Sequence, residues 1–431
     1  MSTRRQFVKK TALLTSALSL IPFAGDLFAR TPTEGEPLPE FFNFTGDKDP
    51  ENDEYWKLVR QAYTMPEDFG NLESGYFNPQ PGKVISAEIL KLQLVNNSWS
   101  HYMRTNFENE KKDTVKKLAA FAGVGEDEII IQRNTTEALN TIISGLEFAQ
   151  GDEIIYADLD YPNMRAALLQ KEQREKIVLK KVILPLSPQN KKEIVDIFEK
   201  AITKKTKLIH LTHAVYLNGL ILPVKEVCQM AHKHNVEVLV DAAHSFAHIN
   251  YKISDLECDY FGTSLHKWLA APLGNGLLYV KKDKISKVWP LMGDMDHKVD
   301  EIIKFDRLGT VCAARLVSIR ASIEFQENIG LANKEARLKY LKNYWTSKVK
   351  DLPGIVMNSP TNDEFSCGIA NVGIEGKEPK EICDYLFDKH KVYTVPINAP
   401  EVKGVRVTPN VFTLKTELDR LVKGFEELCG K

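Results

Sequence analysis

A lysine in an unusual setting stands in the stretch SLHKWLAAPLGNG, residues 264–276. Lys267 follows the strand-like run DYFGTSLH (259–266) and is itself followed by apolar residues. A lysine in apolar surroundings is costly unless its charge is paired or its amine is used covalently. Because a reactive lysine amine forms Schiff bases with carbonyl compounds, the position indicates covalent chemistry, which would need partner residues elsewhere in the chain.

The ends of two other apolar runs also carry polar residues. Asp241 follows VEVLV (236–240), and a carboxylate at the end of a buried strand must pair with a cation to remain ionised. Thr135 and Thr136 follow EIIIQR (128–133) at the expected start of a helix, where hydroxyls and free N–H groups suit a phosphate or a carboxylate. Structural roles stay open, because Asp241 also fits a cap or a buried ion pair, and the threonines fit a helix cap.

Pyridoxal phosphate is the usual biological partner of a Schiff-base lysine, and it needs four kinds of group from a protein. These are a lysine for the aldehyde carbon, an anion for the ring nitrogen, donors for the phosphate and a flat group over the ring. The chain offers them in Lys267, in Asp241, in Thr135, Thr136, Ser264 and His266, and in Tyr161 of DLDYPNM (158–164). The sequence therefore predicts pyridoxal phosphate as the cofactor.

A regular alternation of elements would bring these strand ends together. Strand-like runs lie at 128–133, 152–157, 176–186, 207–214 and 236–243, and helical runs at 136–148, 161–176 and 224–235. This order predicts an α/β fold with a parallel-dominated sheet covered by helices on both faces. In such a sheet, ligands bind where strands end and helices begin.

The pattern changes toward the C-terminus. The runs DYFGTSLH and GLLYVKK (276–282) are separated only by the turn that carries Lys267, which predicts an antiparallel pair. From about Leu331 the chain has a long charged helix (332–352), shorter strands and a final helix (414–428). We expect these residues to form a smaller α+β domain.

Two of these stretches carry a family resemblance. VDAAHS (240–245) and DYFGTSLHKWLAAPLGNGLLYV (259–280) resemble the core of the class V aminotransferases, which are fold-type I pyridoxal-phosphate enzymes. The resemblance extends over roughly residues 66–428. It implies a large cofactor-binding domain (66–330), built on a mostly parallel seven-stranded sheet between helices, and a small C-terminal domain (331–431). Residues 30–65 would form an N-terminal arm or linker.

The resemblance also implies roles for single residues. Lys267 would carry the Schiff base and Asp241 would pair with the ring nitrogen, and these two are the expected catalytic residues. His244 would lie near the ring hydroxyl or the ring nitrogen. The phosphate would be held by Thr135, Thr136, Ser264 and His266, and Tyr161 stands where the family stacks an aromatic side chain on the ring.

Two further residues extend the implied site. Thr310 in DRLGT (306–310) matches a threonine that reaches the phosphate in the neighbouring subunit, which implies a homodimer with shared active sites. Arg406 in GVRVTPNVFT (404–413) matches an arginine that binds the α-carboxylate of the substrate, a role that suits a fork of donors. An ordinary surface arginine is the alternative. The ring-hydroxyl contact stays open between Tyr216 and Asn218.

The chain departs from the cysteine desulfurases of this family. Those enzymes need a mobile cysteine before the carboxylate-binding arginine, and residues 391–407 contain none. The nearest cysteines before this stretch are Cys383 and Cys367. This argues against persulfide chemistry and leaves the isopenicillin-N-epimerase-like branch as the nearer resemblance.

The predicted function is therefore catalysis at the α-carbon of an amino acid, as an aminotransferase or an epimerase. A lyase related to cysteine desulfurase or kynureninase is the alternative, and a non-catalytic exported binding protein is a further one. The aminotransferase, the epimerase and the lyase share the loss of the α-proton as a first step, so the motifs do not separate them.

Composition excludes several other classes of protein. The formal net charge of −1, with both signs mixed along the chain, gives no basic stripe for nucleic acid. The six cysteines have no CxxC spacing, and the histidines lack the spacing of metal ligands, so we expect no metal site. PLGNG (272–276) precedes a strand and lacks a full dinucleotide fingerprint.

The first 29 residues have the pattern of an export signal. Arg4 and Arg5, followed by Phe7 and Lys9, precede a short apolar run (11–24), which is typical of a twin-arginine signal. This predicts export of the folded protein to the periplasm. Leu27 is large for a cleavage site after residue 29, so cleavage stays open, and any membrane attachment would be through an uncleaved signal.

Overall fold

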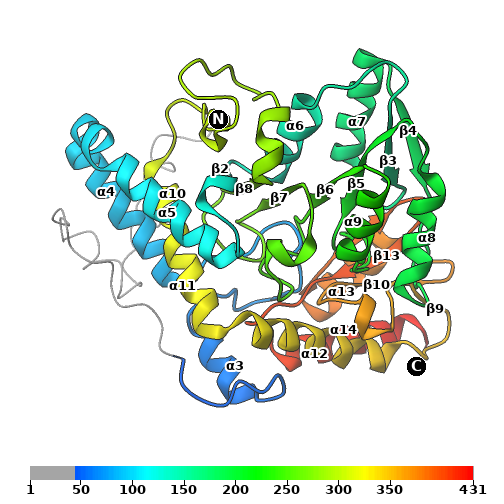
Figure 1. Cartoon of the computed structure of the whole chain (residues 1–431). Helices are drawn as coiled ribbons and strands as arrows, with labels where there is room; N and C mark the ends of the chain where they lie inside the picture. Colours follow the sequence, from blue (N-terminus) through cyan, green and yellow to red (C-terminus); the bar gives the residue numbers. More distant parts are fainter. Residues whose placement is uncertain (1–43, 431) are drawn as a thin grey trace, which may run out of the picture.

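The computed structural model describes residues 44–430, and its centre is a seven-stranded sheet (Figure 1). The strand order is β2-β8-β7-β6-β5-β3-β4. Strands β7, β6, β5, β3 and β4 are mutually parallel, and β8 runs antiparallel to both of its neighbours. The bounds are β2 (Ile129–Gln132), β3 (Glu153–Ala157), β4 (Val178–Val182), β5 (Thr206–Thr212), β6 (Glu237–Asp241), β7 (Tyr260–Ser264) and β8 (Gly276–Val280). The predicted mostly parallel sheet and the antiparallel β7–β8 pair are confirmed.

The apolar strand sequences follow from burial on both faces of the sheet. Every residue of β2, β7 and β8 is buried, as is usual for strands covered by helices on both sides. The edge strand β4 is instead largely exposed and carries Lys180 and Lys181, charges that discourage pairing with another chain. The core therefore extends along the sheet from β2 and thins toward β4.

Alternating residues of the strands face two separate layers. Ile154 packs in the layer under α6 (Thr135–Gly145) and α7 (Pro162–Glu175), whereas Ile155 packs in the layer under α5 (Phe107–Ala122), α8 (Lys191–Ala201) and α9 (Val224–Lys233). This division confirms the helices predicted on both faces. The helices α5 and α8 were not predicted from the sequence.

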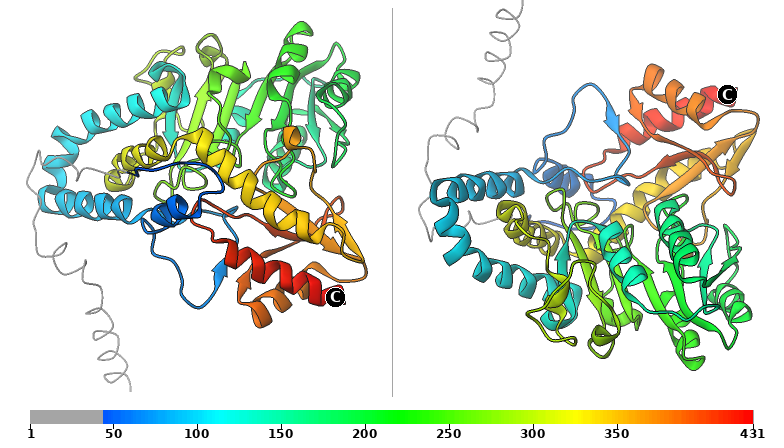
Figure 2. Two further views of the ribbon diagram at one scale, coloured as in Figure 1. Left: turned by 90° about the horizontal axis from the view of Figure 1, so that it is seen from below. Right: turned by 90° about the horizontal axis from the view of Figure 1, so that it is seen from above.

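Helices outside these layers extend the molecule to one side. α4 (Gly82–Thr105) is bent at Trp99, whose φ of 25° is not helical, and it projects with α5 from the body (Figure 2). α10 (Ala313–Val317) packs against α4 and is followed by α11 (Ile319–Ile329). α11 leads directly into the C-terminal part of the chain.

The C-terminal part begins with α12 (Leu331–Val349) and contains a four-stranded antiparallel sheet in the order β12-β13-β10-β9. Its elements are β9 (Ile355–Met357), β10 (Ala370–Ile374), α13 (Pro379–His390), β11 (Val392–Tyr393), β12 (Val395–Asn398), β13 (Lys403–Val407) and α14 (Lys415–Leu428). Two earlier elements are α3 (Asp53–Arg60) and β1 (Gly70–Asn71). Because β1 pairs with β11, the chain near residue 70 touches the C-terminal part, and the exact domain boundaries stay a prediction.

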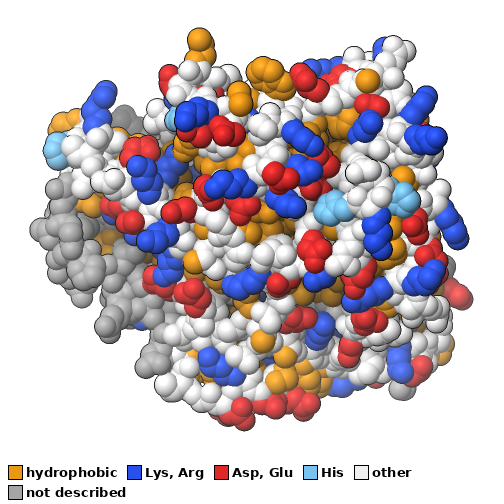
Figure 3. Space-filling model, in the orientation of Figure 1, with side chains coloured by type: hydrophobic (Ala, Val, Ile, Leu, Met, Phe, Trp, Pro, Cys, Tyr) orange, Lys and Arg blue, Asp and Glu red, His pale blue; other side chains and the backbone are white. Residues whose placement is uncertain are grey.

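The surface shows no segregation of charge on the face drawn in Figure 3, where acidic and basic side chains are interspersed. Across residues 44–430, no helix is long and apolar enough to cross a membrane. The predicted signal (1–29) and the first part of the predicted arm (30–65), up to residue 43, lie outside the described residues.

Candidate active site

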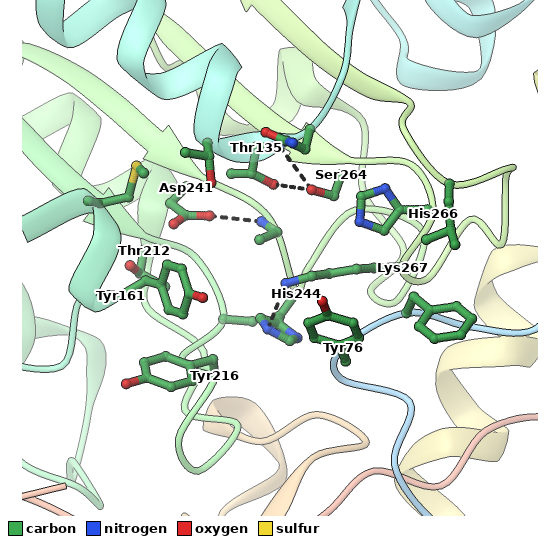
Figure 4. A pocket seen from close by; sticks show the side chains of 17 residues that line it. Tyr76, Thr135, Tyr161, Thr212, Tyr216, Asp241, His244, Ser264, His266 and Lys267 are labelled. Carbon is green, nitrogen blue, oxygen red and sulfur yellow. Dashed lines mark hydrogen bonds between the residues drawn. The ribbon is translucent and has the colours of Figure 1, made fainter. Parts of the chain in front are cut away.

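A pocket of about 270 Å³ lies at the carboxyl ends of β5, β6 and β7 (Figure 4). Lys267 reaches into it from the side opposite Tyr161 and Asp241. The walls also include the starts of α6 and α7 and part of the segment before α4. The predicted residues that line it are Thr135, Thr136, Tyr161, Asp241, His244, Ser264, His266 and Lys267. The pocket thus collects residues from several strand ends, as the parallel sheet requires.

The amine of Lys267 is buried and held at a defined place. Its Nζ donates to Nε2 of His244 at 3.2 Å. Burial lowers the pKa of the Lys267 amine to about 8, although the Asp241 carboxylate acts in the opposite direction. About a tenth of this amine is therefore neutral at pH 7, far more than for an unperturbed lysine, and the neutral form is the one that attacks a carbonyl carbon.

The turn that carries Lys267 is held through its backbone. Four consecutive carbonyls, those of residues 267–270, each accept a hydrogen bond from a side chain elsewhere in the chain. The donors are Asn78 to Lys267 (2.8 Å), Lys334 to Trp268, Gln326 to Leu269 (3.2 Å) and Ser322 to Ala270 (3.3 Å). Because these donors come from three separate segments, the turn is positioned by tertiary contacts.

Asp241 ends β6 and is 3% exposed. Its Oδ1 accepts a hydrogen bond from the N–H of Ala243 at 2.9 Å. Burial raises the pKa of its carboxyl, with His210 acting in the opposite direction. A cationic N–H beside Asp241 would stabilise the carboxylate, and a protonated ring nitrogen supplies such a group.

The start of α6 offers donors for an anion. Ser264 Oγ accepts from the backbone N–H of Thr135 at 2.9 Å and lies 2.7 Å from its Oγ1. A Cβ on Gly276 would lie 2.6 Å from Cα of Asn134, so only glycine lets β8 pass this close to the helix start. The Nδ1 of His266 is buried and has no partner among the described residues. These groups suit a phosphate.

His244 lies beside Lys267 and is neutral. Burial lowers the pKa of its imidazole well below its usual range, and the nearby Lys267 acts in the same direction. Its Nδ1 is buried without a partner among residues 44–430, so it can bond to a bound molecule. Beneath it, His248 bonds to the His244 carbonyl and accepts from the N–H of Gly368, which supports this side of the pocket.

Two tyrosines stand at the opposite wall. Tyr161 precedes α7, is 40% exposed and meets Tyr216 edge to face at 5.2 Å between ring centroids. Tyr216 lines the pocket, whereas Asn218 is buried and donates to the Asn358 carbonyl. Of the two candidates for a ring-hydroxyl contact, only Tyr216 therefore lines the pocket.

Two predicted residues lie away from this pocket. Arg406 lines a neighbouring cavity, where its Nη2 pairs with Oε1 of Glu73 at 2.7 Å. Thr310 is exposed and does not line the pocket of its own chain. Its expected role concerns a neighbouring subunit and stays a prediction.

Sequence reasoning missed the contribution of the segment before α4. Tyr76 and Phe77 line the pocket, and Asn78 binds the Lys267 turn. The segment ESGYFNPQP (73–81) has neither helical nor strand periodicity. The one feature of this segment that could have indicated a site is the adjacent aromatic pair Tyr76 and Phe77, between Gly75 and Pro79.

Comparison with known proteins identifies the family of the chain. Residues 79–394 match the family model described as aminotransferase class-V, and the chain belongs to this family. It is 26% identical over 333 residues to the isopenicillin N epimerase of Streptomyces clavuligerus, covering 73% of this chain and 84% of the relative. It is 29% identical over 322 residues to a probable cysteine desulfurase of Halalkalibacterium halodurans, covering 70% and 77%.

Solved structures show the same fold. A mutant of C-DES with glycine covalently linked to its pyridoxal-phosphate cofactor aligns with a TM-score of 0.79 at 19% identity, over 85% of this chain and 99% of that one. The apo cysteine desulfurase of Thermococcus onnurineus NA1 aligns with a TM-score of 0.78 at 22% identity, over 86% and 97%. The fold-type I architecture is therefore confirmed.

The cofactor of this pyridoxal-phosphate-dependent family fits the residues present. The pocket offers a buried amine, a buried carboxylate whose pKa is raised, and unpartnered imidazole nitrogens on His244 and His266. Pyridoxal phosphate is the cofactor of this chain, as the sequence predicted.

Proposed function

We propose that this chain acts at the α-carbon of an amino acid, as an aminotransferase or an isopenicillin-N-epimerase-like epimerase. The observation that carries the proposal is the Lys267 amine, buried with its pKa lowered to about 8 in one pocket with Asp241. A neutral amine at this place can accept a proton from the α-carbon of a bound substrate.

Each pocket residue would have its own role toward the cofactor or the substrate. Bound pyridoxal phosphate supplies an electron sink for the pair of electrons left at the α-carbon. Lys267 would hold its carbonyl carbon, Asp241 its ring nitrogen, and the start of α6 with Ser264 its phosphate. The negative charge of Asp241 retains the ring proton, and the freed Lys267 Nζ takes the substrate proton. Arg406 would bind the substrate carboxylate.

Lyase action remains the alternative, but its persulfide form is not favoured. A persulfide route needs an accessible thiolate. Cys367 and Cys383 are buried, and burial raises the pKa of each thiol to about 11, so both are protonated near neutral pH. Cys312 is exposed but does not line the Lys267 pocket or the cavity of Arg406. A direct elimination from the substrate requires no such cysteine.

The deciding experiment incubates the holoenzyme with a panel of L- and D-amino acids in heavy water. Release of a keto acid that retains the substrate's side chain, with conversion of the cofactor to its pyridoxamine form, supports the aminotransferase. A deuterated amino acid of inverted configuration supports the epimerase, and loss of a side-chain group supports the lyase. Lys267→Ala is the control and should show none of these. If no amino acid changes the cofactor absorbance or exchanges its α-proton, the proposal is wrong and a binding protein is favoured.

We also propose a homodimer with shared active sites. The segment before Thr310 exposes large apolar side chains, including Trp289, Met295 and Val299, which are 65%, 99% and 68% exposed. Exposed apolar clusters of this kind mark protein interfaces. A second copy covering this segment would bring Thr310 toward the neighbouring pocket.

Export by the twin-arginine route is a further proposal, carried by Arg4 and Arg5 in the sequence. Replacement of both by lysine should retain the protein in the cytoplasm on cell fractionation. Unchanged export of that double variant would contradict the proposal.

A further inference from the structure

The carboxylate of Glu73 already pairs with Arg406, the arginine that is expected to bind the substrate carboxylate. Oε1 of Glu73 lies 2.7 Å from Nη2 of Arg406 and also accepts from the N–H of Tyr76 at 2.8 Å. Nη1 of Arg406 donates to the Tyr216 carbonyl at 3.1 Å. The pair is buried, since the two side chains are 6% and 9% exposed.

The backbone at Gly75 lies directly against the Glu73–Arg406 pair. A Cβ on Gly75 would lie 2.8 Å from Nη2 of Arg406 and 2.9 Å from Oε1 of Glu73, so the chain passes directly against the pair. Two polar atoms nevertheless remain unpartnered among the described residues, Oε2 of Glu73 and Nε of Arg406. The pair is therefore held in place but has unused hydrogen-bonding capacity.

The pair faces a second cavity of about 450 Å³ next to the cofactor pocket. Tyr76 and Phe77 line both cavities, so they form the wall between them. Glu73 and Arg406 are the charged residues in its lining, which is otherwise largely apolar and includes Met65, Pro66, Val395 and Phe412. A carboxylate entering here meets an arginine whose charge Glu73 already offsets.

We propose that Glu73 is a specificity-determining residue that competes with the substrate carboxylate for Arg406. This inference rests on the proposed function, in which Arg406 binds that carboxylate. A substrate carboxylate must replace Glu73 and leave it buried without its partner, which is costly. The enzyme therefore gains less binding free energy from an α-carboxylate than it would if Arg406 were unpaired. Its preference for amino acids over amines without a carboxylate is reduced accordingly.

Two aminooxy reagents test this without knowledge of the substrate. Aminooxyacetate carries a carboxylate and O-methylhydroxylamine does not, and both condense with the cofactor carbonyl carbon and free the Lys267 amine. Stopped-flow absorbance of the holoenzyme gives a rate constant for each reagent. The ratio of the two constants measures recognition of the carboxylate alone.

We expect Glu73→Gln to raise this ratio about tenfold or more, the size of one charge-assisted hydrogen bond. Arg406→Gln should lower the ratio, and the exposed control Glu54→Gln should leave it unchanged. Glu73→Asn removes the charge with a shorter side chain and should act in the same direction as Glu73→Gln.

An unchanged or lower ratio in both Glu73 variants would show that Glu73 only anchors its segment, and the proposal would be wrong. An unchanged ratio in Arg406→Gln would overturn it as well. If neither reagent alters the absorbance of the wild-type protein, the proposed function fails and this inference fails with it.

Discussion

At the scale of single residues, the site depends on placing ionisable groups where water is excluded. Burial lowers the pKa of the Lys267 amine and raises that of the Asp241 carboxyl, so each group is shifted toward its neutral form. In the proposed site, a bound cofactor with a cationic ring nitrogen would offset the cost of keeping Asp241 ionised. Lys267 and Asp241 are therefore better suited to interact with the cofactor than to form an ion pair with each other.

Covalent capture of pyridoxal phosphate by the apoprotein should follow the neutral fraction of Lys267. Because the pKa of this amine is lowered to about 8, the rate should rise about tenfold per pH unit up to pH 8 and then level off. Borohydride reduction followed by mass analysis of the lysine peptide measures it. A rise that continues to pH 10 would mean that the amine is not perturbed, and Lys267→Ala should give no adduct.

Replacement of Asp241 by asparagine should separate cofactor binding from catalysis. The neutral amide cannot hold the ring proton, so turnover should fall by at least about a hundredfold, as for loss of one electrostatic stabiliser. The Lys267 adduct should remain reducible by borohydride. Turnover within a few-fold of wild type would contradict the role assigned to Asp241.

At the scale of elements, the Lys267 turn is held by helices that follow it in the chain. Lys334 lies at the start of α12, is 2% exposed and donates to the Trp268 carbonyl and to Gln326 at 3.0 Å. Burial lowers the pKa of its amine to about 7. The buried amine of Lys334 therefore supports the turn, and keeping this amine protonated costs free energy.

Lys334 should make stability depend on pH in a definite direction. The pKa of Lys334 is lower in the folded protein than in the unfolded chain. The free-energy cost of burying its charged amine is therefore full below pH 7 and disappears as the pH rises toward 10.5. Relative to Lys334→Met, the wild-type holoenzyme should gain up to about 3 kcal/mol between pH 7 and 9.5. Urea denaturation of both proteins at the two pH values measures this gain, and an equal difference at both would contradict it.

At the scale of the whole molecule, the active site is expected to need two copies of the chain. Thr310 does not line its own pocket, whereas Lys267 does. In a dimer with shared sites, each pocket would combine Lys267 of one copy with Thr310 of the other. The two positions can therefore be mutated in separate chains.

Mixing Lys267→Ala with Thr310→Ala chains, after dissociation and reassociation, should restore activity. Half of the dimers would then be mixed and would hold one intact site, so activity should approach about a quarter of the wild-type value. Sedimentation equilibrium checks the dimer itself. Activity no greater than the sum of the two separate variants would exclude a site shared through Thr310.

The sequence by itself determined the elements of the large sheet and most of the pocket. Buried parallel strands are recognisable as short apolar runs, and their carboxyl ends meet at one edge. For this reason Thr135, Asp241, Ser264 and Lys267 could be placed together although up to 132 positions, from 135 to 267, separate them. The helices α5 and α8 were not predicted, although Ile194 and Phe198 lie four positions apart on the buried face of α8.

Only the tertiary structure decided how the pocket is bounded and supported. Glu73 meets Arg406 across 333 positions of the chain, and Lys334 meets Trp268 across 66. Contacts between side chains this far apart depend on the path of the whole backbone and leave no local periodicity. The residues proposed to perform the chemistry could thus be predicted from strand ends, whereas the positions of those proposed to tune it depend on packing between distant segments.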